Sequence, residues 1–306
     1  MENNKINISA APHIRDDVST SSIMLDVIIA LLPCTIFAFI NVGIKAVMIV
    51  CLSLVSAVLS ETLFNIIIKK KNTIGDLSAV VTGLILALTL PQDVEWFMPI
   101  IGAIFAIVVA KMLFGGLGQN FINPAASGRV FLTISFANAM NTFTYDGVTQ
   151  ATPLALARNG EVVDLTKDFL GFIPGAIGEL SVVAILIGGI YLLIKRIIDF
   201  RIPVVYMLTM ILFIIIFSGR GSDFNFIITQ AISGGAMFAA FFMATDYVSS
   251  PTTKLGKVIF AVFLGIMNGI FRLFSNLTEG CQFSIMLANL LVPFINKITL
   301  PKAFGR

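Results

Sequence analysis

The chain has 306 residues, of which 57% are hydrophobic and 12% are charged, and its mean hydropathy is +0.97. A soluble domain carries about 25% charged residues, so this chain has too little charge to cover a water-exposed surface, and we predict an integral membrane protein. Its net charge of +3 is not gathered into one basic segment, which excludes a nucleic-acid-binding protein; the composition also excludes a disordered chain and a secreted disulfide scaffold.

The N-terminal segment, residues 1–22, is polar and contains His13, the single histidine of the chain. No small-residue cleavage site follows the first apolar run, so this segment is not a signal peptide. The three cysteines, Cys34, Cys51 and Cys281, lie in apolar runs without a C-x-x-C spacing. We therefore expect neither a metal site nor a disulfide from this chain alone; a cluster shared with a partner subunit stays open.

Apolar runs long enough to span a membrane follow one another along the chain, since a helix needs about 20 mostly apolar residues to cross the hydrocarbon core. The third and fifth runs are short and are punctuated by Gly83, Pro91 and Pro124, as expected for half-length helices packed against protein. The ten predicted spans are residues 23–41, 44–68, 76–90, 96–113, 124–140, 179–195, 202–218, 226–244, 256–273 and 280–296.

The distribution of Lys and Arg supports this count. With the N-terminus in the cytoplasm, fourteen basic residues, including Lys111, fall on the inner side and five, including Arg272, on the outer side, with Arg129 inside a span. Basic residues accumulate on the cytoplasmic side of membrane proteins. We therefore predict that both termini are cytoplasmic and that the long connection of residues 141–178 lies on the outer face, where its length indicates a functional loop.

The two halves of the chain resemble each other weakly, at residues 82–88 and 234–240 and at residues 113–118 and 273–278. Five spans in each half would turn the second copy upside down, and inverted repeats place a binding site or pathway near the bilayer midplane. The alternative is that Gly-rich apolar helices all look alike. The predicted organisation is a first repeat over 23–140, the loop 141–178, a second repeat over 179–296 and a cytoplasmic tail over 297–306.

Ionisable residues within spans are functional candidates, and the deepest here are Asp26, Glu61 and Arg129. Glu61 either faces a cation path or forms a structural ion pair with Arg129. Asp76 and Asp246 lie near inner span boundaries, where a helix-capping role is favoured over sodium ligation.

Two polar motifs stand out. In the outer loop, Asp146-Gly147-Val148-Thr149-Gln150-Ala151-Thr152-Pro153 is, by composition, a turn with two exposed hydroxyls. Before the fifth span, the stretch from Gly115 to Ala125 combines glycines, which permit close backbone approach, with Asn side chains and a helix-starting Pro124. This second motif indicates either a polar ligand site or only the tight packing of a re-entrant turn.

Together with Pro12-His13-Ile14-Arg15 and the segment Ala244 to Pro251, these motifs occur in the order that characterises the RnfD family of the Rnf complex, and the chain resembles that family over nearly its whole length. The outer-loop motif is similar to the flavinylation motif Asp-Gly-x-Ser/Thr-x-Ala-Thr, in which the last threonine carries FMN through a phosphoester. The sequence departs from the family at Gln150, where Ser or Gly is usual, and at Tyr247, where Pro follows Asp.

The resemblance implies an all-α polytopic protein with urea-transporter-like architecture in the cell membrane. It implies a flavoprotein that relays electrons between ferredoxin and NAD within a pump for Na⁺ or H⁺, with covalent FMN on Thr152 and room for a second, non-covalent flavin, riboflavin or FMN. Implied partners are a flavin transferase, lipid, the membrane subunits RnfA and RnfE, the flavoprotein RnfG, RnfB on the ferredoxin side and RnfC on the NADH side. The implied flavin-binding residues, besides Thr152, are Asp146, Gly147, Thr149, Ala151, Gly115, Gly116, Gly118, Asn120, Asn123, Pro124 and Arg129.

Two other classes of function fit the residues less well. A passive small-solute channel would share the inverted-repeat architecture but has no use for a flavin acceptor motif. An intramembrane hydrolase would need paired catalytic motifs in the spans, and the single histidine lies outside them.

Overall fold

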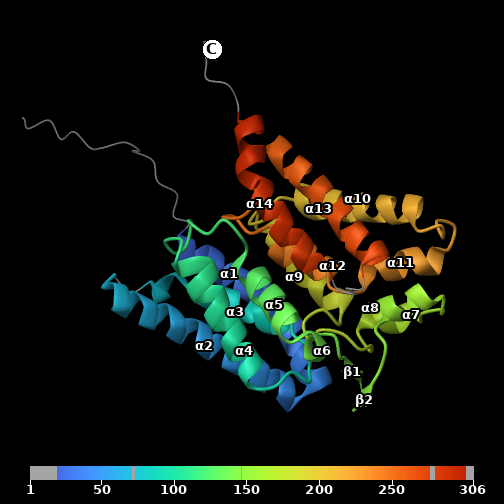
Figure 1. Ribbon diagram of the computed structural model, residues 1–306, viewed down its shortest axis with the longest axis horizontal. Coiled ribbons are helices and arrows are strands. Elements are labelled where there is room, and N and C mark those ends of the chain that lie inside the picture. The colour runs from blue at the N-terminus through green and yellow to red at the C-terminus, as the bar shows by residue number, and fades with distance from the viewer. Residues whose placement is uncertain (1–18, 71–72, 146, 276–279, 301–306) are drawn as a thin grey trace, which may run out of the picture.

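The computed structural model describes residues 19–70, 73–145, 147–275 and 280–300, and its described elements are almost all helices (Figure 1). The exception to the predicted all-α class is one small antiparallel hairpin, β1 (Thr144–Tyr145) and β2 (Val148–Thr149). Gly147 lies between the two strands with φ 75°, the left-handed conformation that a two-residue hairpin turn demands. His13 and Asp146 lie outside the described residues.

The first half begins with two long helices that meet at Gly43, whose φ of 76° lets the chain reverse between them. Ser19 caps the first helix by accepting a hydrogen bond from the Ser22 N–H. The elements are α1 (Thr20–Val42), α2 (Ile44–Ile68), the 3₁₀ turn η1 (Ile74–Asp76), α3 (Ser78–Leu88), α4 (Phe97–Ile104), the π-helical η2 (Phe105–Met112), α5 (Pro124–Ser135) and α6 (Ala137–Met140).

After the hairpin, two short helices of the 141–178 connection lead into the second half. Ser181, Asp223 and Thr253 cap three of the following helices through their side-chain oxygens. The elements are α7 (Pro153–Asn159), α8 (Leu165–Leu170), α9 (Val182–Ile194), α10 (Arg201–Phe217), α11 (Phe224–Ile232), α12 (Ala236–Phe238), the π-helical η3 (Ala239–Met243), α13 (Lys254–Phe274) and α14 (Cys281–Thr299).

Among the described residues, four helices are long and apolar enough to cross a membrane: α1, α2, α13 and α14. The helix α11 and the segment Ala236–Met243 together form a fifth candidate, bent by 50°. The predicted third and fifth spans are indeed short, and the fifth is broken at Phe136 between α5 and α6. The protein is therefore polytopic, while the count of ten spans stays a prediction.

Close helix contacts build the core. The helix α1 packs against α9, α2 against α3, α10 against α13, and α5 against α14. Gly188 and Gly265 permit two of these approaches, since a Cβ at Gly188 would lie 2.0 Å from the Ala30 carbonyl oxygen and one at Gly265 would lie 2.8 Å from that of Tyr206. Small residues at such crossings bring backbones together, as in membrane helix pairs.

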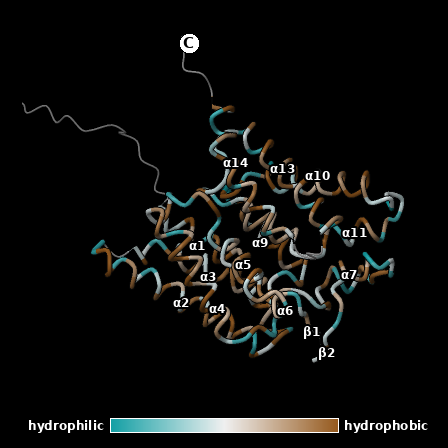
Figure 2. The backbone as a smooth tube through the Cα atoms, viewed as in Figure 1, coloured by the Kyte–Doolittle hydropathy of each residue, from teal (hydrophilic) through white to brown (hydrophobic). Residues whose placement is uncertain are grey.

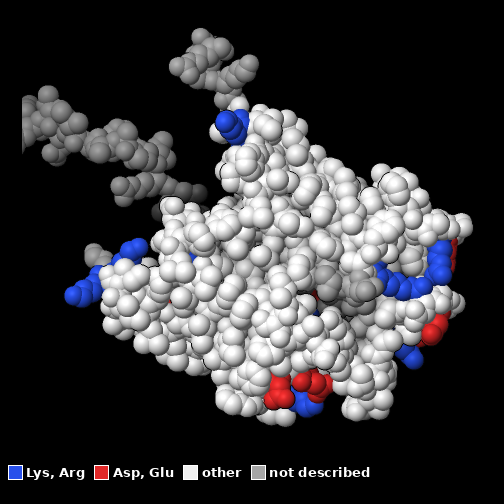
Figure 3. All heavy atoms as spheres, in the orientation of Figure 1, with Lys and Arg blue, Asp and Glu red and all other residues white. Residues whose placement is uncertain are grey.

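The surface agrees with a lipid environment. Hydrophobic residues follow the helices and hydrophilic ones gather mostly at the connections (Figure 2). The face seen in Figure 3 is nearly bare of charge, with its Lys, Arg, Asp and Glu side chains mostly at the edges. Large apolar side chains such as Ile40, Ile67 and Ile194 are more than three-quarters exposed, which a soluble surface rarely tolerates in such numbers.

Candidate functional site

Thr152, the predicted flavin acceptor, begins the short helix α7. Its hydroxyl oxygen accepts a hydrogen bond from the Ala155 N–H at 3.4 Å, and its side chain is largely covered, with the residue 7% exposed. Gly147, Thr149 and Ala151 are exposed. The prediction of two exposed hydroxyls in this turn thus holds for Thr149 and is wrong for Thr152, because the N-cap role turns its hydroxyl toward the helix backbone.

A cavity of about 540 Å³ opens beside Thr152, with Ala151 and Pro153 in its wall. The lining contains the aromatic residues Tyr145 and Phe172, and it contains Lys167 together with Asp164, whose carboxylate lies 3.9 Å from the Lys167 ammonium. The volume lies within the range of about 300–1,000 Å³ typical of small-molecule sites. An aromatic ring system matches the size and the aromatic residues of this lining.

Two arginines connect the Thr152 segment to the second half by binding carbonyls at helix C-terminal ends. Arg220 donates to the Ala157 carbonyl at the end of α7 at 3.0 Å. Arg158, on α7, donates to the Arg272 and Ser275 carbonyls at the end of α13 at 3.0 and 2.8 Å. The last four carbonyls of a helix have no partner within it, so each guanidinium holds one helix end on another.

The side chain of Arg272 continues this connection to the break between α11 and α12. It donates to the Ser233 and Gly234 carbonyls at 2.8 and 3.1 Å and to the Gln230 carbonyl. The Ser233 hydroxyl in turn donates to Asp168 of α8. We call Asp168, Gln230, Ser233, Gly234 and Arg272 the Arg272 cluster.

Asp168 is 1% exposed. Burial raises its pKa to about 6, against the opposing effects of the Ser233 hydrogen bond and the Arg272 charge. Asp168 therefore titrates closer to neutral pH than an ordinary carboxyl.

In the second predicted motif, Gly115, Gly116 and Gly118 have φ values of 122°, 99° and 90°. This conformation strongly favours glycine, so the glycines are explained by the tight turn between η2 and α5. The Asn120 side chain donates to the Ile122 carbonyl at 3.1 Å and braces the same turn. These contacts agree with the packing interpretation of the motif.

Asn123 and Pro124 start α5 as expected, with the Asn123 side-chain oxygen accepting from the Ala126 N–H. The Asn123 amide also donates to the Met243 carbonyl at 3.0 Å, which joins this motif to the segment that holds Asp246. Asn120, Asn123, Pro124 and Asp246 line one cavity of about 80 Å³. The structure thus brings two predicted motifs together, around a space smaller than the volume of a typical ligand site.

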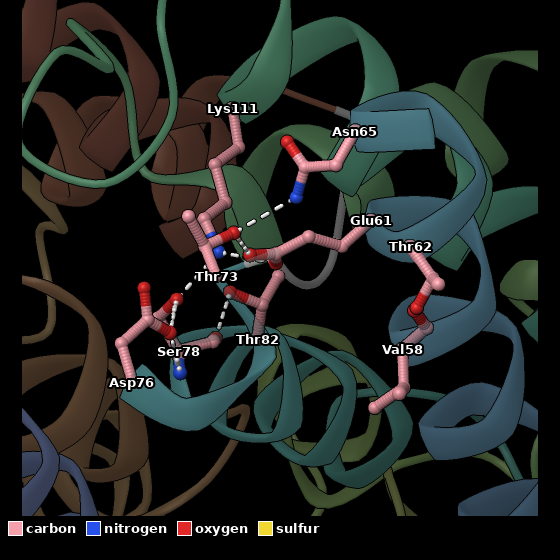
Figure 4. A network of polar contacts seen from close by, with 9 residues as sticks. All are labelled: Val58, Glu61, Thr62, Asn65, Thr73, Asp76, Ser78, Thr82 and Lys111. Carbon is pink, nitrogen blue, oxygen red and sulfur yellow. Dashed lines mark hydrogen bonds and ion pairs between the residues drawn. The ribbon is translucent and has the colours of Figure 1, made fainter. Parts of the chain in front are cut away.

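A second cluster of charges lies between α2, α3 and η2 (Figure 4). Glu61 is fully buried and accepts from the Lys111 ammonium at 2.7 Å, and Lys111 is 2% exposed. Glu61 therefore pairs with Lys111, and the alternative of a pair with Arg129 is wrong. Lys111 reaches Glu61 because η2 packs directly on α2.

The same cluster contains Asp76. The Lys111 ammonium donates to the Ser78 hydroxyl, which donates to the Asp76 carboxylate, and the Ser78 N–H donates to that carboxylate at 2.8 Å. On its other side Glu61 accepts from Thr73. We call Glu61, Thr73, Asp76, Ser78 and Lys111 the Glu61–Lys111 cluster; in it Asp76 binds the start of α3, as the helix-capping prediction required.

The remaining ionisable candidates lie apart. Asp26 accepts from the Tyr191 hydroxyl at 2.6 Å and lies 3.7 Å from the Lys195 ammonium, which joins α1 to α9. Arg129 is 3% exposed and donates to the Thr133 hydroxyl. Asp246 accepts from the Ser249 hydroxyl at 2.7 Å and caps no described helix.

Sequence reasoning missed Lys111 and Arg272 as buried residues, since it counted both as charges of the connections. A signal was present at Lys111, because it follows a run of apolar residues from Phe97 with no other charge. Arg272 had the same signal on α13, where it is separated from Lys257 by fourteen uncharged residues.

The fold and the buried charges define a polytopic membrane protein with polar clusters inside its helical core. The chain belongs to the NQR2, RnfD, RnfE family, whose model matches residues 7–305. It is 44% identical, over 98% of its length and 95% of the relative, to the D subunit of the Na⁺-translocating ferredoxin:NAD⁺ oxidoreductase complex of Acetobacterium woodii. It is 38% identical, over all of its length and 98% of the relative, to the D subunit of the proton-translocating ferredoxin:NAD⁺ oxidoreductase complex of Clostridium ljungdahlii.

Proposed function

We propose that this chain is the RnfD component of an Rnf-type ion-translocating ferredoxin:NAD oxidoreductase in the cell membrane, and that it carries FMN as a phosphoester on Thr152. The observation that carries the proposal is the coincidence of the acceptor threonine with a fitting cavity, in a chain of this family. The partners are the membrane subunits RnfA and RnfE, the flavoprotein RnfG, RnfB on the ferredoxin side, RnfC on the NADH side, and a flavin transferase.

The proposed topology has ten spans in two inverted repeats with both termini in the cytoplasm. Five helical segments precede the 141–178 connection and five follow it, counting α4 with η2, α5 with α6, and α11 with α12 and η3, and leaving out the short turn η1. In each half the second segment packs on the third and fourth, and α1–α9 and α5–α14 are contacts between corresponding segments. This pattern supports the repeat, and the bias of basic residues supports the orientation with Thr152 on the outer face.

The residues around Thr152 fit a flavin. Tyr145 and Phe172 line the adjacent cavity and suit an aromatic ring, while the Lys167 ammonium, 3.9 Å from Asp164, has three donors and keeps some of them for phosphate. FMN, when bound, supplies one-electron transfer steps that no side chain of this chain can perform. The transferase must first open the N-cap bond of Thr152, whose loss costs about 0.5–2 kcal/mol in typical helices.

A second, non-covalent flavin belongs to the proposal as well, with the turn from Gly115 to Pro124 as its expected location. The cavity there, at about 80 Å³, does not hold a flavin ring in the described arrangement. Binding would therefore require a wider arrangement of the elements that line this cavity.

For the transported ion, the chain offers Glu61 and Asp76 in one buried cluster, with Asp26 and Asp246 elsewhere. One relative is named for Na⁺ translocation and another for proton translocation, so membership of the family does not decide the ion. The ion is identified by measuring Na⁺ uptake into sealed vesicles while the complex reduces NAD with ferredoxin. Na⁺ uptake that persists with a protonophore indicates a sodium pump. Na⁺ uptake that the protonophore abolishes indicates a proton pump.

Covalent attachment is tested on a denaturing gel of the complex expressed with its transferase. We expect a fluorescent flavin band for the wild type and for the matched control Thr166→Ala, an exposed threonine of the same connection that lies outside the motif, and no band for Thr152→Ala. A fluorescent Thr152→Ala band or a dark wild-type band contradicts the proposal. Solute flux through the isolated chain in liposomes, without electron transfer, would favour a passive channel instead.

A further inference from the structure

A cavity of about 480 Å³ lies where α9 is connected to α10, bounded on its other side by Tyr247, Ser250 and the first turns of α13. Three cationic side chains line it, from Arg196, Arg201 and Lys257, against the single carboxylate of Asp199. Two positive charges are therefore uncompensated within its lining. We call this cavity the Arg196 pocket.

The cations of the pocket retain free donors. Asp199 accepts from Arg201 at 2.8 and 3.1 Å, through one guanidinium nitrogen, and from Lys257 at 3.2 Å. A guanidinium has five N–H donors and an ammonium three, so both residues keep donors for another acceptor. Among the residues that the structure describes, the Arg196 side chain has no hydrogen-bond or ion-pair partner.

Arg196 lies at the C-terminal end of α9 in a backbone conformation that favours glycine. Its N–H binds the Leu193 carbonyl at 3.0 Å and the Ile197 N–H binds the Leu192 carbonyl at 2.9 Å, which together end α9 in a Schellman motif. Arg196 takes the left-handed position of this motif, with φ 58°, where glycine costs least. Lys69 ends α2 in the same conformation, so what distinguishes Arg196 is that its side chain lines this cavity.

The surroundings favour a lipid over a free ion. Phe200 lines the cavity and is 56% exposed, and Ile194 at the end of α9 and Val204 in the first turn of α10 are 76% and 48% exposed. Acyl chains can lie along this surface while a phosphate lies among the cations. Basic pockets between membrane helices bind anionic headgroups in this way.

We propose that the Arg196 pocket binds the phosphate headgroup of an anionic membrane lipid. Arg196 supplies the uncommitted guanidinium, and Arg201 and Lys257, held in place by Asp199, supply the remaining donors. The proposal is independent of flavin attachment at Thr152.

The test uses the full chain, reconstituted in vesicles of equal parts phosphatidylcholine and phosphatidylglycerol and then extracted for native mass spectrometry. Arg196→Gly removes the guanidinium and suits the left-handed backbone, so the fold is retained. The matched control is Lys69→Gly, because Lys69 ends α2 in the same motif with φ 58° and does not line the pocket.

We expect the wild type and Lys69→Gly to retain phosphatidylglycerol, and Arg196→Gly to bind it about tenfold more weakly, the loss expected for one charge-assisted hydrogen-bonded contact. Equal retention by Arg196→Gly and Lys69→Gly overturns the proposal. In a parallel arm, inorganic phosphate is added to the wild type with and without bound lipid. If the same phosphate concentration that saturates the lipid-free protein also displaces the lipid, the site is one for free phosphate and the lipid assignment is wrong.

Discussion

The Glu61–Lys111 cluster and the Arg272 cluster both bury a basic side chain at the end of the fourth helical segment of their half, but they neutralise it differently. Lys111 lies 2.7 Å from a carboxylate. Arg272 donates to backbone carbonyls at the end of α11 and at the break that follows, and to the Gln230 amide oxygen. The first cluster is an ion pair, whereas the second is a helix-end cap.

The different partners of Lys111 and Arg272 indicate what each cation stabilises. A buried ion pair depends on both partners being present, because either one alone is an uncompensated charge. A guanidinium on carbonyls stabilises a particular backbone shape, here the 50° bend between α11 and the segment Ala236–Met243. The first half is therefore expected to be sensitive to charge balance, and the second to the loss of donors.

The largest effect is expected for Lys111→Met. It leaves Glu61 buried without its cation, which costs about 3–5 kcal/mol of unfolding free energy in comparable pairs. The double variant Glu61→Gln with Lys111→Met should recover most of the loss, and thermal unfolding in detergent measures both. Additive losses in the double variant would mean that the two side chains are not coupled.

The next effect is expected for Arg272→Met, at about 3 kcal/mol, since each buried carbonyl that loses its donor costs about 1–3 kcal/mol and the break can partly relax. Arg220→Met is the control, because Arg220 also binds a helix-end carbonyl but is exposed, where water replaces the bond. If the two variants unfold at the same temperature, burial does not explain how much the Arg272 hydrogen bonds contribute to stability.

A smaller, pH-dependent effect is expected at Asp168. Its pKa is raised to about 6 in the fold, so the unfolded chain loses this proton first and the carboxyl's contribution to stability falls as pH rises from about 4 to about 6. Between pH 5 and pH 7 the wild type should lose on the order of 1 kcal/mol of unfolding free energy relative to Asp168→Asn. Unfolding temperatures of the two proteins that keep a constant difference across this range would contradict the assignment.

The smallest effect is expected for Lys45→Ala, which removes an ion pair with Asp93 in which the lysine side chain is 59% exposed. Exposed pairs contribute about 0–1 kcal/mol and weaken with salt. A loss as large as that of Lys111→Met would show that distance, rather than burial, governs the ion pairs of this protein. The measurement is the same thermal unfolding, repeated at high salt.

Much of the architecture was readable in the sequence. Apolar length placed α1, α2, α13 and α14, and Pro124 after Asn123 marked the start of α5 correctly. The break at Ser233–Gly235 was not predicted, because two glycines in an apolar run fit a continuous helix as well as a bend. The exposure of Thr152 was also misjudged, since an N-cap role depends on a helix of only seven residues.

The sequence identified several ionisable residues of the candidate sites, but it did not predict which residues they contact. Glu61 and Asp76 were separate candidates, and only the fold joins them, through Lys111 and Ser78. Lys111 is fifty positions from Glu61 in the sequence. The residue pattern of a helix indicates which of its faces is apolar but does not identify the helix that packs against it.

By itself the sequence determined the solvent and the family, and it predicts the acceptor motif around Thr152, because composition and short motifs are local properties of the chain. Only the tertiary structure decided which charges are buried, which carboxylate has a cation, and which arginines hold helix ends together. The physical reason is that the stability of a charge depends on the few ångströms around it, and in a helical membrane protein those neighbours come from segments distant in the chain.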